Sequence, residues 1–273
     1  MKWAVPLVAA LGLVACQKKW NPADEPVKPP LRVDAAAAAH SLERAAEWMA
    51  AFPAGELRFD AAIALSAIHS HGTTAKLDEA LAHARVVADA DTDNPLRRAF
   101  DPAFSLPAEK TSRWEVPAKG APRVNVNRVV AEALHCAQNG LRPETLAYLE
   151  GPMRDGGGYQ TTHALWALTL ARDAGCLKLD EFNRRAGPLV AELRAANPPA
   201  PGPAALDVDL FAERTLMIEL AGARDDQVTR SVQALIAAQN ADGSFGASAD
   251  GGAEPAYFRF HATMTATWAI AAH

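Results

Sequence analysis

Stretches with helical periodicity, separated by residues that break helices, make up most of this chain. From Ala35 onward, apolar residues recur at the three- and four-residue spacing of an α-helix, and no run of alternating Val, Ile or Thr indicates a strand. The sequence therefore predicts an all-α fold. We expect ten helices, at 35–51, 59–71, 75–89, 125–139, 143–153, 160–175, 179–196, 207–222, 225–240 and 259–272.

The expected helices are of two kinds, which alternate along the chain. Helices such as LDEALAHARVVADA carry charges on one face and apolar residues on the other. The helices between them, such as HALWALTLA, are apolar around more of their circumference. Because helices that are apolar nearly all round are buried and striped helices face water, we expect five pairs of an outer and an inner helix.

The connections between helices alternate in length as well. Links from an inner helix to the next outer helix are short, whereas the reverse links are longer and contain Pro and Gly, notably 90–124, 197–206 and 241–258. If the pairs close into a ring, the long links lie at the end where the inner helices begin. Long loops and positive helix dipoles favour a functional site at that end. A floppy insertion is an equal alternative for 90–124.

The first residues indicate export. Residues 1–16 read MKWAVPLVAALGLVAC, with an apolar run too short for the roughly 20 residues of a membrane-spanning helix. The last four, LVAC, resemble the bacterial lipobox. We therefore expect residues 1–15 to be a signal peptide and Cys16 to be lipid-modified. Gln17 in place of Asp favours anchoring in the outer membrane of the cell envelope, facing the periplasm; an ordinary secretory signal is the alternative.

The remainder of the chain is expected to be a tether followed by one domain. Residues 17–34 contain four prolines and mixed charges without an apolar period, so we expect 16–34 to be flexible and 35–273 to form the helical domain. The net charge of −5, without a basic block, excludes the electrostatic footprint of a nucleic-acid-binding protein. The sequence does not indicate an oligomeric state.

Two cysteines remain in the expected domain, Cys136 and Cys176. An exported protein permits a disulfide between them, and two buried free thiols are an equal alternative. Neither cysteine lies in a CxxC or CxxH pattern, which disfavours metal binding or nucleophilic chemistry.

One segment resembles a known repeat. Residues 232–246, VQALIAAQNADGSFG, are similar to the repeat of the terpenoid cyclase and protein prenyltransferase family, in which a helix ending in Gln leads to a Gly-aromatic turn. Residues 155–159, DGGGY, are a looser copy. The resemblance implies a single α/α toroid of about five outer-inner hairpins around a central funnel. It does not imply the family's chemistry.

The resemblance also identifies residues to compare with the family's zinc site. His261, in YFRFHAT, resembles the zinc-binding histidine segment of protein prenyltransferases. Gln160 and Thr162 stand at the positions of the other ligands, and neither side chain suits that role. We therefore expect no metal and no other cofactor.

Carboxylates provide the candidates for catalysis. Class II terpene cyclases protonate an alkene with an Asp-X-Asp-Asp motif, and DVDL resembles it, with Asp209 in the acid's place, Asp207 before it and Leu210 breaking the motif. N-capping is the favoured alternative for both aspartates. A glycan-active lyase or hydrolase would instead use a pair such as Asp207, Asp209 and Glu254.

Aromatic and histidine side chains on the inner helices are expected to line the funnel. They are Tyr159, His163, Trp166, Phe260, His261 and Trp268. Core packing is the alternative, and for His163 beside Trp166 it is the favoured one. Because each catalytic motif is incomplete, we expect a binding or scaffold role with an apolar or amphiphilic ligand. An enzyme acting through Asp209 or the rim carboxylates is the alternative.

Overall fold

The computed structural model describes residues 30–111, 126–150, 156–198, 207–246 and 256–273. The chain divides into the units Met1–Pro30 and Leu31–His273, and all of the described helices belong to the second unit. The predicted signal peptide and Cys16 lie outside the described residues.

The described residues form helices and contain no strand, which confirms the all-α prediction. Each predicted helix is present with ends shifted by a few residues, and the predicted end of one, at 151–153, lies outside the described residues. Short 3-10 helices η2 (Ala54–Glu56) and η3 (Pro95–Ala99) are additional. The α-helices are α1 (Ala35–Ala50), α2 (Phe59–His71), α3 (Ala75–Ala90), α4 (Ala108–Thr111), α5 (Val126–Asn139), α6 (Pro143–Glu150), α7 (Tyr159–Asp173), α8 (Leu179–Ala196), α9 (Val208–Leu220), α10 (Asp226–Ala237) and α11 (Ala256–Ala272).

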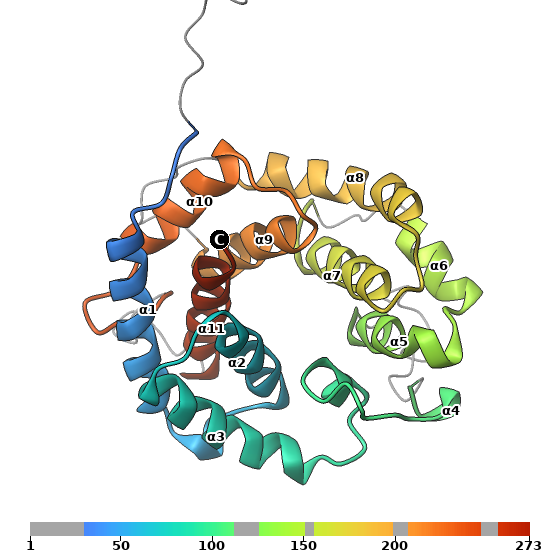
Figure 1. The fold of residues 1–273 in the computed structure, drawn as a ribbon, viewed down its shortest axis with the longest axis horizontal. Helices are drawn as coiled ribbons and strands as arrows, with labels where there is room; N and C mark the ends of the chain where they lie inside the picture. Colours follow the sequence, from blue (N-terminus) through green and yellow to red (C-terminus); the bar gives the residue numbers. More distant parts are fainter. Residues whose placement is uncertain (1–29, 112–125, 151–155, 199–206, 247–255) are drawn as a thin grey trace, which may run out of the picture. The chain divides into compact units, whose positions relative to one another are not determined.

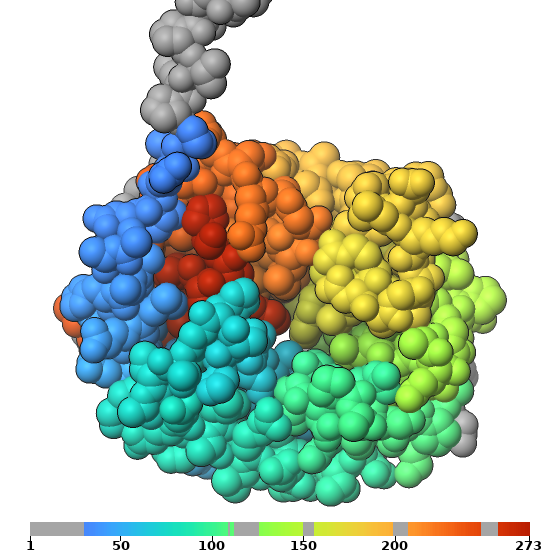
Figure 2. Space-filling model, viewed as in Figure 1, coloured from blue at the N-terminus to red at the C-terminus, as the bar shows by residue number. Residues whose placement is uncertain are grey.

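The helices occupy two kinds of position. In Figure 1, α2, α5, α7, α9 and α11 lie toward the middle, and we call them the inner helices; α1, α3, α6, α8 and α10, the outer helices, lie around them. The inner helices pack side by side in the order α2, α11, α9, α7, α5, and η3 contacts both α5 and α2. Side chains fill most of the space between the ribbons on the face seen in Figure 2. Within the described ranges, no helix has both the length and the apolar composition needed to cross a bilayer.

Neighbouring inner helices run in the same direction. At one end, the hydroxyl of Tyr159, the first residue of α7, donates to Asp209 in the first turn of α9. At the other end, Arg172 of α7 donates to the backbone oxygen of Leu220, the last residue of α9. The first turns of these helices therefore lie together, and polar residues placed in them meet.

Part of the long link 90–124 is ordered by contacts with α5. Residues 95–99 form η3, and the buried ring of His135 makes a hydrogen bond of 2.9 Å from Nε2 to the backbone oxygen of Pro95. Burial lowers the pKa of His135, so the ring is neutral at physiological pH. The described part of this link is thus an ordered segment and not a flexible insertion. Residues 112–125 of the link lie outside the described ranges.

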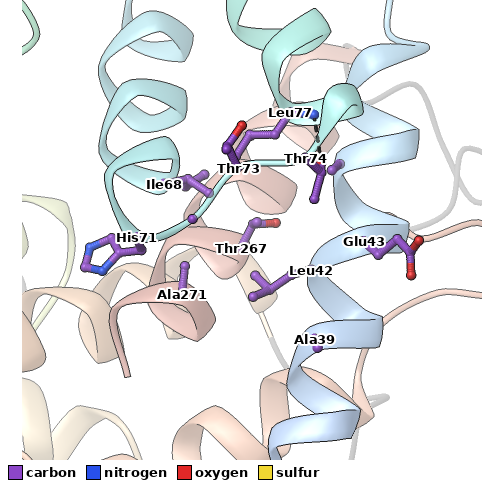
Figure 3. Close-up of a pocket in the computed structure, with 12 residues that line it drawn as sticks. Ala39, Leu42, Glu43, Ile68, His71, Thr73, Thr74, Leu77, Thr267 and Ala271 are labelled. Carbon is purple, nitrogen blue, oxygen red and sulfur yellow. Dashed lines mark hydrogen bonds between the residues drawn. The ribbon is translucent and has the colours of Figure 1, made fainter.

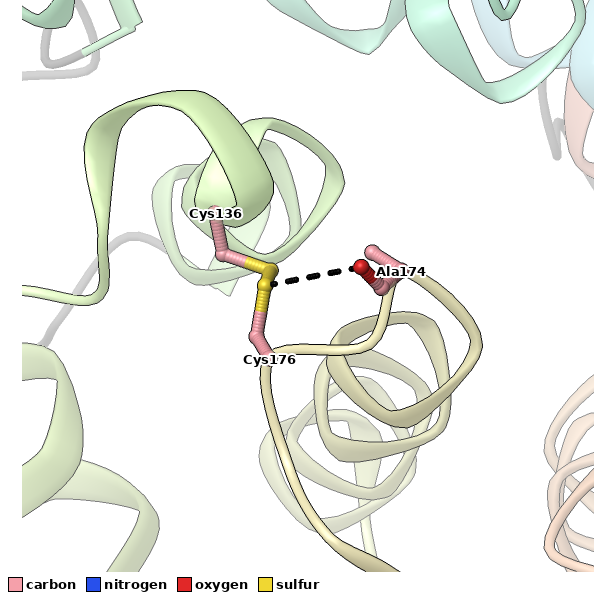
Figure 4. Close-up of a disulfide and its surroundings, with 3 residues drawn as sticks. All are labelled: Cys136, Ala174 and Cys176. Atoms are coloured by element: carbon pink, nitrogen blue, oxygen red, sulfur yellow. Dashed lines mark hydrogen bonds between the residues drawn. A yellow bond between two sulfur atoms is a disulfide. The ribbon is translucent and has the colours of Figure 1, made fainter.

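A disulfide joins α5 to the turn that follows α7. Cys136 and Cys176 are bonded, with Cα atoms 6.2 Å apart (Figure 4). The sequence left open whether these thiols pair, and the structure shows that they do. The bond closes a loop across 40 residues and fixes the last turn of α5 against the end of α7.

Replacing both cysteines, as in Cys136→Ala with Cys176→Ala, should lower the free energy of unfolding by about 2–4 kcal/mol, because the unfolded chain regains the freedom that the crosslink removes. Urea unfolding of the variant and the wild type measures the difference. Reductant should produce the same loss in the wild type and none in the variant. Equal stability of the two proteins in oxidising buffer would contradict a structural role for the bond.

The Gly-aromatic turn after α10 packs against α1. Gly243 has φ +92, and a Cβ atom there would clash with the backbone oxygen of Arg44 in α1. The amide of Gln239 donates to the backbone oxygens of Ser41 and Gly243, at 2.9 Å each. Phe245 is fully buried. The residues of the repeat motif therefore join the last outer helix to the first.

The looser copy of the motif makes an equivalent contact. Gly157, with φ +80, approaches α8 so closely that its Cβ would lie 2.7 Å from the Cβ of Ala196. Its backbone N–H donates to Glu192 of the same helix at 2.8 Å. In both copies, a glycine in the left-handed region lets a turn pack on another outer helix.

We expect Gly243→Ala to lower the free energy of unfolding by about 2–4 kcal/mol, because it adds a clash with backbone atoms to the cost of a positive φ. The matched control is Gly222→Ala. Gly222 has φ +98 but nothing within 4 Å of a Cβ atom, so only the conformational cost of about 1 kcal/mol applies. Equal losses in thermal or urea unfolding would show that the contact with α1 contributes nothing.

Candidate functional site

A cavity of about 340 Å³ lies among the inner helices and η3. The charged and histidine side chains that line it, with Asn127, lie within the first six residues of these helices or directly before them: Arg58, Asp60, Asn127, His163, Glu213 and His261. Two further polar residues line it, Asn94 before η3 and Thr265 one turn after His261. The apolar lining residues come mostly one turn later: Ile63, Trp166, Leu216, Met217, Met264 and Trp268. Since a helix rises 1.5 Å per residue, the wall changes from polar to apolar with depth.

Asp209 connects three inner helices. Its Oδ2 accepts a hydrogen bond of 2.6 Å from the hydroxyl of Tyr159, and its Oδ1 lies 2.7 Å from Nδ1 of His261. Its side chain is 17% exposed. Burial, followed by the hydrogen bond to Asp209, raises the pKa of Tyr159, so the phenol keeps its proton. Asp209 thus accepts a hydrogen bond from Tyr159 and, when His261 is protonated, a second one from His261.

His261 is a cation at neutral pH. Burial alone would lower its pKa, but the hydrogen bond and charge of Asp209, with the charges of Asp60 and Glu213, raise the pKa to about 9. Its Nδ1 is bound by Asp209, whereas its Nε2 lies 4.0 Å from Oδ2 of Asp60. Nε2 therefore faces the cavity without a hydrogen bond to a described residue.

His163 makes the same kind of pair one turn deeper. Its Nδ1 lies 3.0 Å from Oε1 of Glu213 and 2.8 Å from the backbone oxygen of Tyr159, so Nδ1 carries a proton. Burial opposes protonation of His163, but the charge of Glu213 outweighs it and raises the pKa. Thr162 also donates to this carboxylate. The other oxygen of Glu213, Oε2, is buried and has no hydrogen-bond partner.

A third carboxylate lies at the opening. Asp60 in the first turn of α2 accepts a hydrogen bond from Tyr257 of α11, and burial with the charge of Asp60 raises the pKa of this phenol. The guanidinium of Arg58 stacks over the Tyr257 ring, 4.3 Å from its centroid. Through these contacts, α2 joins α7, α9 and α11 in the group of polar side chains at the beginnings of the inner helices, which we call the polar layer.

Two tryptophans form part of the apolar wall. The rings of Trp166 and Trp268 meet edge to face, with centroids 6.4 Å apart, and the ring of His163 meets Trp166 in the same way at 6.1 Å. The indole nitrogen of Trp268 is buried without a partner. The side chains predicted to share the funnel thus contact one another, as the i and i+3 spacing of His163 and Trp166 requires.

The remaining predicted residues lie elsewhere. Asp207 caps α9 and accepts from the backbone N–H of Leu210 at 3.3 Å, which is the alternative that the sequence favoured. Phe260 is fully buried and packs on Phe52, with ring centroids 4.7 Å apart, rather than lining the cavity. Tyr159 and Asp209 do not line the cavity; they contact its lining residues His163 and His261, respectively. Glu254 lies outside the described residues.

Sequence reasoning missed Glu213, Asp60 and Tyr257. Glu213 had a signal, since it is an acidic residue inside the apolar inner-helix sequence ERTLMIEL, four residues after Asp209 and so on the same face. Asp60 lies in a first helical turn, where an acidic residue is explained by the helix dipole alone. In the described part of the chain, no group of three or more His, Cys, Asp or Glu side chains is arranged to hold a metal ion.

A second cavity, of about 230 Å³, lies between α1, the link from α2 to α3 and the end of α11 (Figure 3). Leu42, Ile68, Leu77 and Ala271 make most of its wall apolar. None of the residues that the sequence singled out for binding or catalysis lines it. The cavity among the inner helices is therefore the candidate site.

Comparisons with known proteins add no identification, because no family model, curated protein or solved structure matches the chain.

The stability of the fold should depend on His261 in a defined pH range. Its folded-state pKa of about 9 lies above the ordinary value of 6.5, so protonated His261 contributes stability below pH 6.5 that is lost as pH rises through 9. Relative to His261→Gln, the wild type should lose up to about 3 kcal/mol across this range.

Urea unfolding of both proteins between about pH 6 and pH 10 measures this difference. His69→Gln, which removes an exposed histidine near the other end of α2, is the control for the loss of an imidazole outside the cavity. A difference between wild type and His261→Gln that stays constant with pH would contradict the ion pair with Asp209.

Proposed function

We propose that the inner and outer helices form a closed α/α toroid of the kind found in terpenoid cyclases and protein prenyltransferases. The shared direction of α7 and α9 and the packing order of the inner helices support it. The contact of Gly243 with α1 also supports closure, because it makes the first outer helix the neighbour of the last. In such a toroid, the cavity among the inner helices is the central funnel.

The proposed function is the binding of an apolar or amphiphilic ligand in this cavity. The observation that carries the proposal is the composition of the wall, in which the charged and histidine side chains lie within the first two helical turns and the large apolar side chains lie mostly beyond them. A volume of about 340 Å³ lies within the range of small-molecule sites. The apolar body of a ligand would lie against Trp166, Trp268 and Met264, with its polar end at the histidines.

We place this binding protein at the bacterial cell envelope. The support is in the sequence, where LVAC at 13–16 resembles a lipobox and residues 16–34 provide a tether. A lipid on Cys16 would keep the domain at the surface of the outer membrane, on the periplasmic side. The disulfide is consistent with an oxidising compartment.

An enzyme is the second candidate, favoured by one observation. His163 and His261 each have Nδ1 held by a carboxylate, which leaves Nε2 for a ligand in the cavity, as in general acid-base catalysis. The cyclase-like role of Asp209 gains no such support, because that mechanism needs a protonated acid and Asp209 accepts hydrogen bonds from both neighbours. Native mass spectrometry of the protein with its co-purified ligand, before and after incubation, distinguishes the two: an enzyme converts the ligand.

Filling the cavity should abolish binding. The neutral probe N-phenyl-1-naphthylamine should bind the wild type with increased fluorescence, and Ala64→Phe, which places a ring in the cavity, should weaken binding at least about tenfold. The matched control is Ala39→Phe, which places the same ring in the second cavity and should leave binding unchanged. Circular dichroism verifies folding of both variants. Probe binding that is weakened only by Ala39→Phe would contradict the proposal.

A further inference from the structure

We infer that the ligand of this cavity has an uncharged head group that carries hydroxyls, and that a paired set of charges in the first two turns of the inner helices selects it. The inference rests on the proposed function, since it specifies the ligand of the same cavity. It goes beyond it by naming the chemistry of the polar end.

The first argument is that the charges around the cavity are already paired within the protein. His261 lies 2.7 Å from Asp209, and His163 lies 3.0 Å from Glu213. Asp60 in turn lies 4.0 Å from His261, so each of these three carboxylates faces a histidine, and the guanidinium of Arg58 stacks on Tyr257. A cationic head group would lose its hydration without finding a carboxylate that no histidine faces, and an anionic one would have to compete with these carboxylates for the histidines or displace Arg58 from the Tyr257 ring; both are costly in a largely buried site.

The second argument is the set of hydrogen-bonding positions that remain open. Nε2 of His163 and Nε2 of His261 make no hydrogen bond to a described residue, and Nε2 of the His261 imidazolium is a donor. Oε2 of Glu213 is an acceptor without a partner, and the terminal carboxylate bond rotates easily. Because a hydroxyl both donates and accepts, it suits a mixed set of this kind better than an ammonium, which only donates, or a carboxylate, which only accepts.

The third argument is the apolar wall directly below the polar layer. Trp166 lies one turn after His163 on α7, and Met264 and Trp268 follow His261 on α11. A ligand held by its hydroxyls at the histidines must therefore place its apolar body against these side chains. An alcohol or glycoside of a hydrocarbon chain has this arrangement.

Three probes of equal chain length test the head group: 1-octanol, octanoate and octylammonium, each used at neutral pH to displace N-phenyl-1-naphthylamine from the full domain. We expect 1-octanol to bind at least about tenfold more tightly than either charged probe. Equal affinities, or tighter binding of a charged probe, would overturn the inference and leave the proposed function intact. If none of the three displaces the probe, the inference fails, whereas the proposed function fails only if the probe does not bind the cavity.

Charge variants test whether the pairing sets this preference. Glu213→Gln removes a negative charge and should shift the ratio of affinities at least about tenfold toward octanoate over octylammonium. His261→Gln removes a positive charge and should shift the same ratio toward octylammonium. Glu79→Gln and His69→Gln make the same chemical changes at exposed positions and should leave the ratio unchanged.

Replacing the buried Glu213 could impair folding, so a second acidic residue is tested as well. The side chain of Asp60 is 42% exposed, and Asp60→Asn should therefore disturb folding less. It should shift the ratio in the same direction as Glu213→Gln. Ratios that do not change in any of the three cavity variants would overturn the inference, whatever the affinities of the wild type.

Discussion

Burial of the inner helices is the constraint on which the rest of this structure depends. A helix surrounded by other helices leaves its polar side chains little access to bulk water, so those that are mostly buried need a partner on a neighbouring inner helix. Asp209 and His261 meet this requirement jointly, as do His163 and Glu213. The hydrogen bonds that satisfy burial are therefore also the ones that align the first turns and give the cavity its polar layer.

Much of the fold follows from local sequence signals. Periodicity and breakers define α1 to α3 within about one residue, and Asp207 caps α9 because a short acidic side chain before a helix accepts from its free N–H groups. The distinction between inner and outer helices follows from how much of each helix is apolar. These features depend on residues that are close together in the chain, so they can be predicted from one sequence.

The site depends on contacts between residues far apart in the chain, which local sequence patterns do not predict. His261 and Asp209 are 52 residues apart, and their hydrogen bond exists only because α9 and α11 pack in one particular register. The disulfide likewise depends on the register of α5 against α7. Phe260, an aromatic residue on an inner helix, was expected to face the cavity, but helix rotation turns it toward Phe52 instead. Successive residues of an α-helix are about 100° apart around its axis. A one-residue error in the predicted orientation of the helix therefore decides whether a side chain faces the cavity or the core.

The same pairing that satisfies burial also limits the chemistry of the cavity. A site that protonates an alkene needs an acid that is isolated from acceptors and cations, so that it retains its proton. Here Asp209, Glu213 and Asp60 are each held by a donor from another helix, although the buried Oε2 of Glu213 has no partner. An arrangement with balanced charges and few open hydrogen-bonding positions pre-organises the wall for a neutral polar group. Stability of the inner helices and selection of the ligand are thus consequences of one set of contacts.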